Sequence, residues 1–259
     1  MDNARPIRRP AFAPSLAFLV AAFVGGLAVT ANRPAPAMEL VTDSSPVVIE
    51  LYTSQGCSSC PPADEYLGEL ATRRDVLPLA FHVDYWNYIG WEDPFSSPEA
   101  TARQRAYARV LGLRTVYTPQ MVIDGAAHEI GSHRAAVASA IKAAAAQPKA
   151  SLVLMNDGAG YKVMIGDGAG AMAALAEPAT VWLIEYDREQ VTDVQRGENE
   201  GKMLTTHNVV RAFRAIGEWN GAAIEIALPA AETDAEACAV IVQAGPVGPI
   251  YAAAAFVME

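Results

Sequence analysis

Two cysteines separated by two serines are the side chains of this sequence best suited to chemistry. They are Cys57 and Cys60, and the third cysteine, Cys238, stands alone. A disulfide that closes so short a loop removes little entropy from the unfolded chain, so it would be a weak structural cross-link. A zinc site built from four thiolates needs two such pairs, and the sequence contains one. We therefore interpret Cys57 and Cys60 as a redox-active dithiol.

The place of the dithiol in the chain favours a reactive thiolate. A short apolar run over residues 46–54 predicts a buried strand, and Pro61-Pro62 fits the first turn of a helix. The amides and the partial positive charge at a helix N-terminus stabilise a thiolate at the leading cysteine. We expect Cys57 to be the nucleophile that forms a mixed disulfide with a partner, and Cys60 to resolve it.

The residues around the dithiol predict alternating strands and helices as far as residue 148. After the helix that begins at Pro61, the pattern predicts a strand, a helix, two strands joined by an Asp-Gly turn, and a last helix; the ranges are 76–83, 96–112, 118–125, 126–130 and 132–147. A strand, a helix and a second strand in succession form the unit that builds parallel sheets. We therefore predict an α/β domain over residues 38–148, with a central mixed sheet flanked by helices.

The pattern of apolar and polar residues changes near residue 149. From there to the C-terminus, short apolar stretches are separated by clusters of Gly, Asp and Pro. Regularly spaced short strands of this kind are typical of an antiparallel sandwich or of a sheet that packs on a neighbouring domain. We therefore predict a second, mainly β, sandwich-like domain over residues 149–259 that packs on the first.

The first 37 residues have the pattern of an export signal. Three arginines precede an uncharged apolar run over 11–31, and Ala35 and Ala37 form a small-x-small cleavage site. The alternative is an uncleaved N-terminal anchor, because the apolar run approaches the length of a short membrane span. Both interpretations place the rest of the chain outside the cytoplasm, as a periplasmic or secreted protein. Such compartments favour disulfides.

Composition and motifs narrow the class of partner. The net charge is −10, and the loss of four arginines and one aspartate with residues 1–37 makes it −13. An acidic protein is unsuited to nucleic acid or to an anionic membrane surface. The sequence contains no Gly-rich phosphate loop, Gly-x-Ser-x-Gly elbow or His-Glu-x-x-His motif. We expect no cofactor, no membrane contact beyond the possible anchor, and a partner that is a protein or small-molecule thiol or disulfide.

The position of the dithiol between a strand and a helix resembles the thioredoxin fold. Proteins of that fold carry a cis-proline that faces the dithiol, and Thr118-Pro119 at the start of a predicted strand matches it. The resemblance implies that Pro119 presents backbone to a bound substrate chain and that Thr118 touches both sulfur and substrate. An ordinary loop proline is the alternative. The sequence departs from thioredoxin in having Gly56 instead of a tryptophan before the dithiol, and about sixty residues between Cys57 and Pro119.

Three longer segments resemble a family of secreted bacterial proteins catalogued as domain of unknown function 1223. The segments are residues 50–64, 82–95 and 196–211. The resemblance spans nearly the whole chain after the export signal and implies a thioredoxin-like fold. It also singles out three residues whose spacing indicates no mechanism, and we expect these to be interdomain hydrogen-bonding residues: His207, Asn208 and Arg211.

Two strand residues have open interpretations. Glu50 is a lone charge in an apolar strand; under the dithiol its pKa would rise and it could shuttle a proton for Cys60, whereas at an edge it would face solvent. His82 and Asp84 alternate along the second strand and therefore share a face. Together with Cys57 and Cys60, His82 could form a copper or zinc site. A hydrogen-bonded structural histidine is the simpler interpretation.

Five aromatic side chains crowd the segment from Tyr85 to Phe95. They could line a groove for an unfolded chain or an apolar ligand, or they could pack over the sheet edge or between domains. Cys238 lies in an apolar stretch and is expected to be a buried apolar residue.

The leading functional hypothesis is an exported thiol-disulfide oxidoreductase. The alternatives are a periplasmic copper- or zinc-binding or metal-delivery protein that uses the same thiolates, and a thioredoxin-fold binding module without catalysis. The fold alone does not choose between them, because one scaffold carries many functions.

Overall fold

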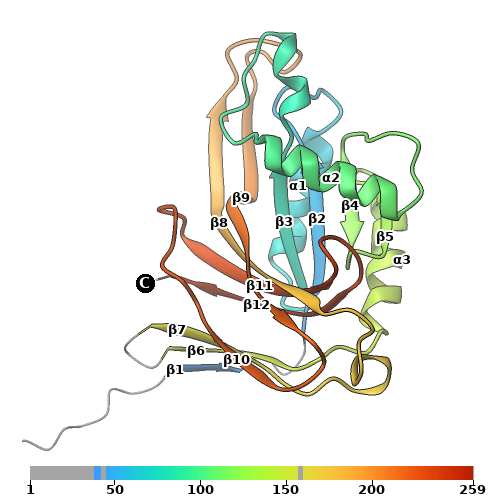
Figure 1. Cartoon of the computed structure of the whole chain (residues 1–259). Coiled ribbons are helices and arrows are strands. Elements are labelled where there is room, and N and C mark those ends of the chain that lie inside the picture. The colour runs from blue at the N-terminus through green and yellow to red at the C-terminus, as the bar shows by residue number, and fades with distance from the viewer. Residues whose placement is uncertain (1–37, 42–44, 157–159, 259) are drawn as a thin grey trace, which may run out of the picture. The chain divides into compact units, whose positions relative to one another are not determined.

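A mixed eight-stranded sheet is the largest feature of the protein (Figure 1). The computed structural model describes residues 38–41, 45–156 and 160–258, and the predicted export signal lies outside them. The described part forms one compact unit. In the sheet order β12-β11-β8-β9-β3-β2-β4-β5, the strands are β12 (Ile250–Val257), β11 (Ala237–Ala244), β8 (Ala179–Asp193), β9 (Met203–Trp219), β3 (Val76–His82), β2 (Val47–Thr53), β4 (Gln120–Ile123) and β5 (Ala127–Ile130).

Two of the strand pairs in this sheet are parallel and the others are antiparallel. Strand β2 runs parallel to β3 along its whole length, and β3 meets β9 in parallel where Ala80 lies beside Val209. On the other side, β2 pairs antiparallel with β4, which turns into β5 at Asp124 and Gly125. Both turn residues have positive φ angles, of 51° and 66°, a backbone conformation that Asp and Gly tolerate at low cost.

Helices cover both faces of the sheet around β2. They are α1 (Pro61–Ala71), α2 (Pro98–Val110) and α3 (Arg134–Ala145), with short 3-10 helices η1 (Asp84–Ile89) and η2 (Gly170–Met172). Side chains alternate along a strand, so Ile49 and Leu51 pack against α1 and α3 while Val48 and Tyr52 pack toward α2. All seven residues of β2 are consequently buried, as the apolar run predicted.

A second, antiparallel sheet of four strands packs against β8, β11 and β12 of the large sheet (Figure 1). Its order is β1 (Met38–Val41), β6 (Leu152–Asn156), β7 (Tyr161–Ile165) and β10 (Ile224–Ala227). Leu152 and Val163 of this sheet share a hydrophobic core with Leu183 and Val240 of the large sheet. The large sheet itself draws four strands from each side of residue 148, so it crosses the boundary predicted between the two domains.

Strands β8 and β9 form a long hairpin that the sequence pattern did not indicate. They contain 15 and 17 residues, whereas the sequence pattern predicted only short strands after residue 149. Their register shifts twice, as β-bulges do. The hairpin extends past the ends of β2 and β3, and its far part lies beside η1 (Figure 1).

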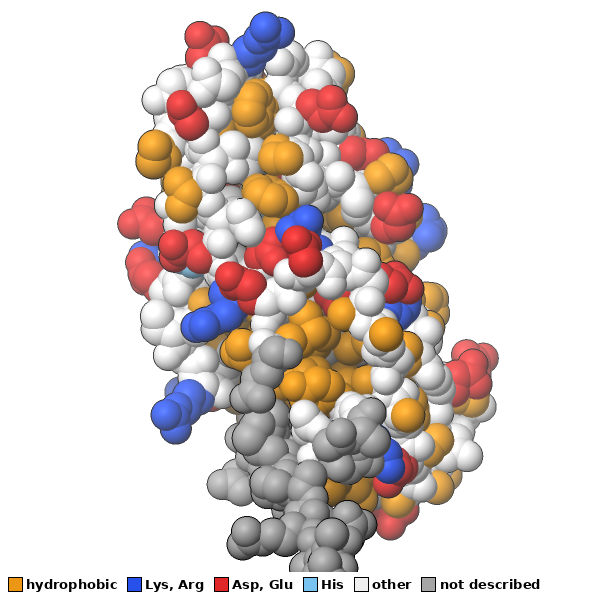
Figure 2. All heavy atoms as spheres, turned by 90° about the vertical axis from the view of Figure 1, so that its left-hand side faces the viewer, with side chains coloured by type: hydrophobic (Ala, Val, Ile, Leu, Met, Phe, Trp, Pro, Cys, Tyr) orange, Lys and Arg blue, Asp and Glu red, His pale blue; other side chains and the backbone are white. Residues whose placement is uncertain are grey.

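The surface that carries β8 mixes charges of both signs. On the face in Figure 2, acidic and basic side chains are interspersed around a central apolar area. Among the described helices, none has the length and apolar character needed to cross a membrane.

Candidate functional site

Cys57 and Cys60 form a disulfide at the turn between β2 and α1. Their Cα atoms are 5.4 Å apart, and Cys60 is the N-cap residue of α1, followed by two prolines. The two cysteines are buried, whereas Ser58 and Ser59 between them are exposed. The chain therefore brings the predicted pair together at the start of a helix, with the intervening backbone open to solvent.

Thr118 holds its hydroxyl against the leading sulfur. The Thr118–Pro119 peptide bond is cis, and Thr118 Oγ1 donates a hydrogen bond to Cys57 Sγ at 3.3 Å. Trp86 Nε1 in turn donates to Thr118 Oγ1 at 2.8 Å, which fixes the orientation of the hydroxyl. Ser59 Oγ lies 3.4 Å from the same sulfur. Two hydroxyl groups thus adjoin Cys57 Sγ, and both can donate to a thiolate.

The aromatic segment packs around the dithiol turn. Trp86 lies so close to Gly56 that a Cβ atom at residue 56 would be 3.1 Å from Trp86 Cβ. Trp91 Nε1 donates to Gln55 Oε1 at 3.0 Å, while Tyr88 is 81% exposed. The chain therefore leaves little room for a side chain at residue 56, next to Trp86 and Ile89.

The tip of the β8–β9 hairpin, residues 194–202, also reaches the dithiol. The buried Asn199 donates through Nδ2 to the carbonyl oxygens of Gln55 and Cys57, at 2.9 and 3.0 Å. Glu198 Oε2 accepts a hydrogen bond from the Ser58 amide at 3.2 Å. The sequence analysis missed both residues, although they lie in the segment that carries the family resemblance. Their signal was an Asn and a Glu between two glycines, which by itself indicates a turn.

A buried network of charged groups lies beside the dithiol turn. Asp93 Oδ2 accepts hydrogen bonds from the Gln55 amide at 2.8 Å and from His82 Nδ1 at 2.7 Å. Burial opposes the ionisation of both partners, but their attraction outweighs it, so the pKa of Asp93 is lowered and that of His82 is raised. The aspartate thereby couples His82 to the backbone that leads into the dithiol.

Asp64 is a second buried acid of this network. It lies one helical turn after Cys60, and its amide donates to the Cys60 carbonyl at 3.1 Å. Burial raises the pKa of Asp64 to about 7, partly offset by the nearby His82 and by the Thr53 hydroxyl. Asp64 Oδ1 and His82 Nε2 are buried without a hydrogen-bond partner among the described residues. Unpartnered buried atoms of this kind are uncommon and are typical of functional sites.

A comparison with protein families identifies the chain. The family model described as "Protein of unknown function (DUF1223)" matches residues 48–243. The chain belongs to the DUF1223 family.

Two solved structures resemble this DUF1223 protein. The crystal structure of protein AGR_C_4864 from Agrobacterium tumefaciens is 32% identical, with a TM-score of 0.72, and the match covers 83% of this chain and 95% of that one. HBP35 of Porphyromonas gingivalis is 12% identical, with a TM-score of 0.54 and coverage of 83% and 76%; this likeness concerns the fold alone. No curated protein matches the chain.

Glu50 of this DUF1223 protein has neither of the two environments considered for it. Its carboxylate is buried on the α2 face of the sheet, away from α1, and therefore does not face solvent. It accepts hydrogen bonds from Arg103 at 2.7 and 2.9 Å, from Tyr107 at 2.6 Å and from Tyr52 at 2.9 Å. Since these partners occupy the carboxylate, we do not retain Glu50 as the proton shuttle for Cys60.

His82 is held by Asp93 rather than by the cysteines. Among the described residues, no three His, Cys, Asp or Glu side chains are grouped so that they could hold a metal ion. Asp84 begins η1 instead of continuing the strand, and its carboxylate accepts from Thr101 at 2.6 Å. The structure therefore does not bring His82, Asp84 and the two cysteines into one group.

The three residues singled out by the family resemblance connect β9 with its neighbours. Asn208 Nδ2 donates to the Pro78 carbonyl at 2.7 Å, across the predicted domain boundary. Arg211 pairs with Asp187 at 2.5 Å and His207 with Glu189 at 3.7 Å, both between β9 and β8. Of the three, Asn208 makes a bond of the kind expected, whereas the ion-pair partners of the other two lie within the hairpin.

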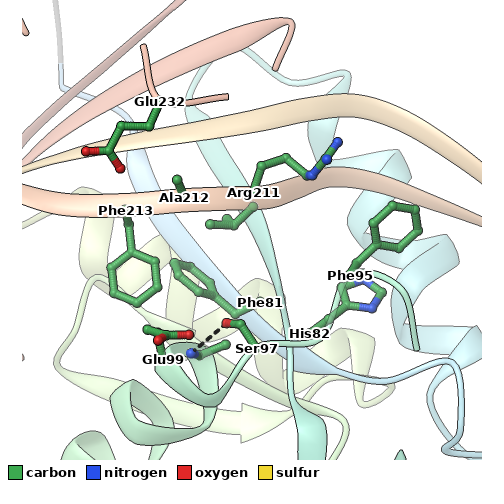
Figure 3. A pocket seen from close by; sticks show the side chains of 11 residues that line it. Phe81, His82, Phe95, Ser97, Glu99, Arg211, Ala212, Phe213 and Glu232 are labelled. Atoms are coloured by element: carbon green, nitrogen blue, oxygen red, sulfur yellow. Dashed lines mark hydrogen bonds between the residues drawn. The ribbon is translucent and has the colours of Figure 1, made fainter. Parts of the chain in front are cut away.

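A cavity of about 240 Å³ lies between β3, β9 and the start of α2 (Figure 3). His82 and Phe95 are at one end of it and Phe213 and Glu232 at the other. The rings of His82 and Phe95 meet edge to face, with centroids 5.6 Å apart. His82 thus lines this cavity and also belongs, through its bond to Asp93, to the charged network next to the dithiol.

Cys238 is a free, buried thiol, far along the chain from the dithiol. Burial and the nearby Glu185 raise its pKa to about 12, and its Sγ donates to Met258 Sδ at 3.2 Å. At neutral pH it is therefore a protonated residue in an apolar setting.

Proposed function

We propose that this protein is an exported, periplasmic or secreted thiol-disulfide oxidoreductase. Residues 38–148 form its thioredoxin-like domain, and residues 149–259 form a mainly β, sandwich-like domain that packs on the first and contributes four strands to the same sheet. Cys57 is the nucleophile and Cys60 the resolving cysteine. The observation that carries the proposal is the position of the Cys57–Cys60 disulfide at the N-terminus of α1, with the Thr118 hydroxyl in contact with Cys57 Sγ. Both features favour a thiolate on Cys57.

The proposed reaction moves two electrons between the dithiol and a disulfide of a partner protein or small molecule. The Cys57 thiolate attacks one partner sulfur, which forms a mixed disulfide and releases the other partner sulfur as a thiolate. The Cys60 thiolate then attacks Cys57 Sγ, which restores the Cys57–Cys60 disulfide and releases the second partner thiolate. Oxidation of a partner dithiol follows the same steps in reverse.

Asp64 supports the second step, because Cys60 must lose its proton before it can attack. Residues four apart lie on one face of a helix, so Asp64 follows Cys60 directly along α1. Its carboxyl has a pKa of about 7 because it is buried, which suits a group that accepts a proton near neutral pH. In this role Asp64 takes the place that the sequence suggested for Glu50.

Thiol titration and trapping test the proposal. We expect the reduced protein to show a Cys57 pKa well below the ordinary value of about 8.5, and its disulfide to exchange with glutathione. The C60A variant should accumulate mixed disulfides through Cys57, whereas the C57A variant should not. A normal Cys57 pKa together with a disulfide that resists glutathione would contradict the proposal, and C60A that traps no partner would favour a non-catalytic binding module.

A further inference from the structure

The hairpin tip brings charge to the dithiol from a part of the chain 140 residues away. Four of its nine residues are charged: Arg196, Glu198, Glu200 and Lys202. Of these, Glu198 contacts the dithiol turn directly, through the Ser58 amide at 3.2 Å. Lys202 instead donates to Asn199 Oδ1 at 2.9 Å.

The tip is held against the dithiol turn by several independent contacts. Asn199 is fully buried and donates to two carbonyl oxygens of the turn. At the base of the tip, Gln55 Nε2 donates to Thr192 Oγ1 at 2.9 Å. Gly197 adopts a φ of 83° and packs so closely that a Cβ atom there would lie 3.2 Å from Trp91 Cβ. The backbone that carries Glu198 is therefore fixed beside Ser58.

The Ser58 amide is the first one after Cys57 and lies in the turn before α1, two residues ahead of the N-cap Cys60. A backbone amide next to the leading cysteine is a donor that can stabilise its thiolate. A carboxylate bound to this amide occupies that donor and adds a negative charge nearby. Hydrogen bonds from Ser58 hold the pKa of Glu198 below its usual value, so this carboxylate is ionised at neutral pH.

We propose that Glu198 is a positioning residue that restrains the reactivity of the dithiol, because it competes with the Cys57 thiolate for the Ser58 amide. The inference rests on the proposed function. It implies that the reduced form is less stable than the helix N-terminus alone would make it, so the disulfide is a weaker oxidant. The hydroxyls of Thr118 and Ser59 lie within hydrogen-bonding distance of Cys57 Sγ. The buried acids of the surrounding network are Asp64 and Asp93.

The test compares E198Q with E200Q in the otherwise unchanged chain. Both variants remove one negative charge from an exposed side chain of the tip, but the hydrogen bond with the Ser58 amide is made by Glu198. The rate of alkylation of reduced protein by iodoacetamide, followed from pH 5 to pH 9, reports the Cys57 thiolate. For E198Q at pH 6 and low salt we expect the alkylation rate to increase about two- to fivefold. This range corresponds to the interaction energy that an exposed charge typically contributes.

The same variant should have a more positive reduction potential against glutathione, and its gain in rate should shrink as salt screens the charge. E198A, which also removes the acceptor of the amide, should show at least the same gain. E200Q should match the unaltered protein in both measurements. The inference would be overturned if E198Q and E200Q had the same alkylation rate and reduction potential, whether or not these differ from the values of the unaltered protein.

A different result would contradict the proposed oxidoreductase function rather than the role of Glu198. If the disulfide of the unaltered protein does not exchange with glutathione, the oxidoreductase proposal fails, whatever the tip variants do. The alkylation profiles still report whether Glu198 controls the Cys57 thiolate. If exchange occurs and the profiles of E198Q and the unaltered protein coincide, the inference alone is wrong.

Discussion

Glu50 and Asp64 are buried on opposite faces of the central sheet and are stabilised in different ways. Glu50 accepts four hydrogen bonds from Arg103, Tyr107 and Tyr52 on the α2 face. Arg103 lies in turn within 6 Å of four aromatic ring centres, the nearest at 5.3 Å. On α1, by contrast, Asp64 keeps one carboxylate oxygen without a partner among the described residues.

The difference separates a structural ion pair from a group that can exchange protons. A buried ion pair whose hydrogen bonds are all made is costly to break. A buried acid with an unpartnered oxygen has a raised pKa, so it can take up or release a proton near neutral pH. A buried acid next to a dithiol therefore has to be judged by its partners as well as by its place in the sequence.

The strongest test of this contrast is E50Q compared with E69Q. E50Q leaves the Arg103 charge buried and uncompensated, so we expect a loss of about 3–5 kcal/mol in the free energy of unfolding. Glu69 forms an exposed pair with Arg134, and E69Q should cost at most about 1 kcal/mol. Urea denaturation measures both. A small loss for E50Q would show that the α2 cluster is not a structural ion pair.

N199A should have the next largest effect on stability. It removes two hydrogen bonds to the dithiol turn and leaves the carbonyls of Gln55 and Cys57 without this donor. We expect a loss of about 1–3 kcal/mol in the free energy of unfolding, measured by urea denaturation of the disulfide form. N220A is the control, since Asn220 is exposed and accepts a hydrogen bond from the Ala222 amide at the surface, and it should cost about 1 kcal/mol or less. Equal losses would mean that the tip is not anchored by Asn199.

D64N should slow the resolution of the mixed disulfide by about tenfold or more at pH 7 and above, because it removes the proton acceptor. Stopped-flow measurement of the second step with oxidised glutathione tests this. E65Q, one residue along the helix and exposed, should react at the normal rate. If E50Q slows the second step and D64N does not, the roles of the two acids are reversed.

Stability against pH gives an independent check on Asp64. Its pKa is about 7 in the folded protein and 3.8 as the ordinary value. Between these values the native state binds more protons than the unfolded state, so Asp64 makes stability fall as the pH rises from about 4 to about 7. The raised pKa of His82 acts in the same direction: its contribution is present below 6.5 and is lost above. In D64N the fall should be shallower, and an unchanged slope would contradict the raised pKa.

T118V should have the smallest effect. It keeps the shape of the side chain but removes the hydroxyl that donates to Cys57 Sγ. We expect the pKa of Cys57 to rise by about half a unit, which corresponds to roughly threefold slower alkylation at pH 6. Thr115 is exposed, so T115V should alkylate at the normal rate. A faster reaction in T118V would mean that the hydroxyl does not stabilise the thiolate.

The sequence alone determined the local arrangement around the disulfide. An apolar run before Cys57 and prolines after Cys60 specify a buried strand followed by a helix through backbone preferences that act over a few residues. The α/β order up to residue 148 follows from the same short-range signals. Helix α2 begins at Pro98 with Ser97 as its N-cap, two residues later than predicted, because the cap hydroxyl decides the first turn.

Tertiary structure decided which distant side chains meet the dithiol. Asp64 was visible in the sequence as an acid in the first turn of a helix, but its environment depends on His82 and Asp93 from other elements. Glu198 and Asn199 come from the tip of a hairpin whose second strand is too polar to be recognised by periodicity. The pKa of a buried group and the partner of a backbone amide are set by atoms that are close in space and remote in the chain, so only the folded structure specifies them.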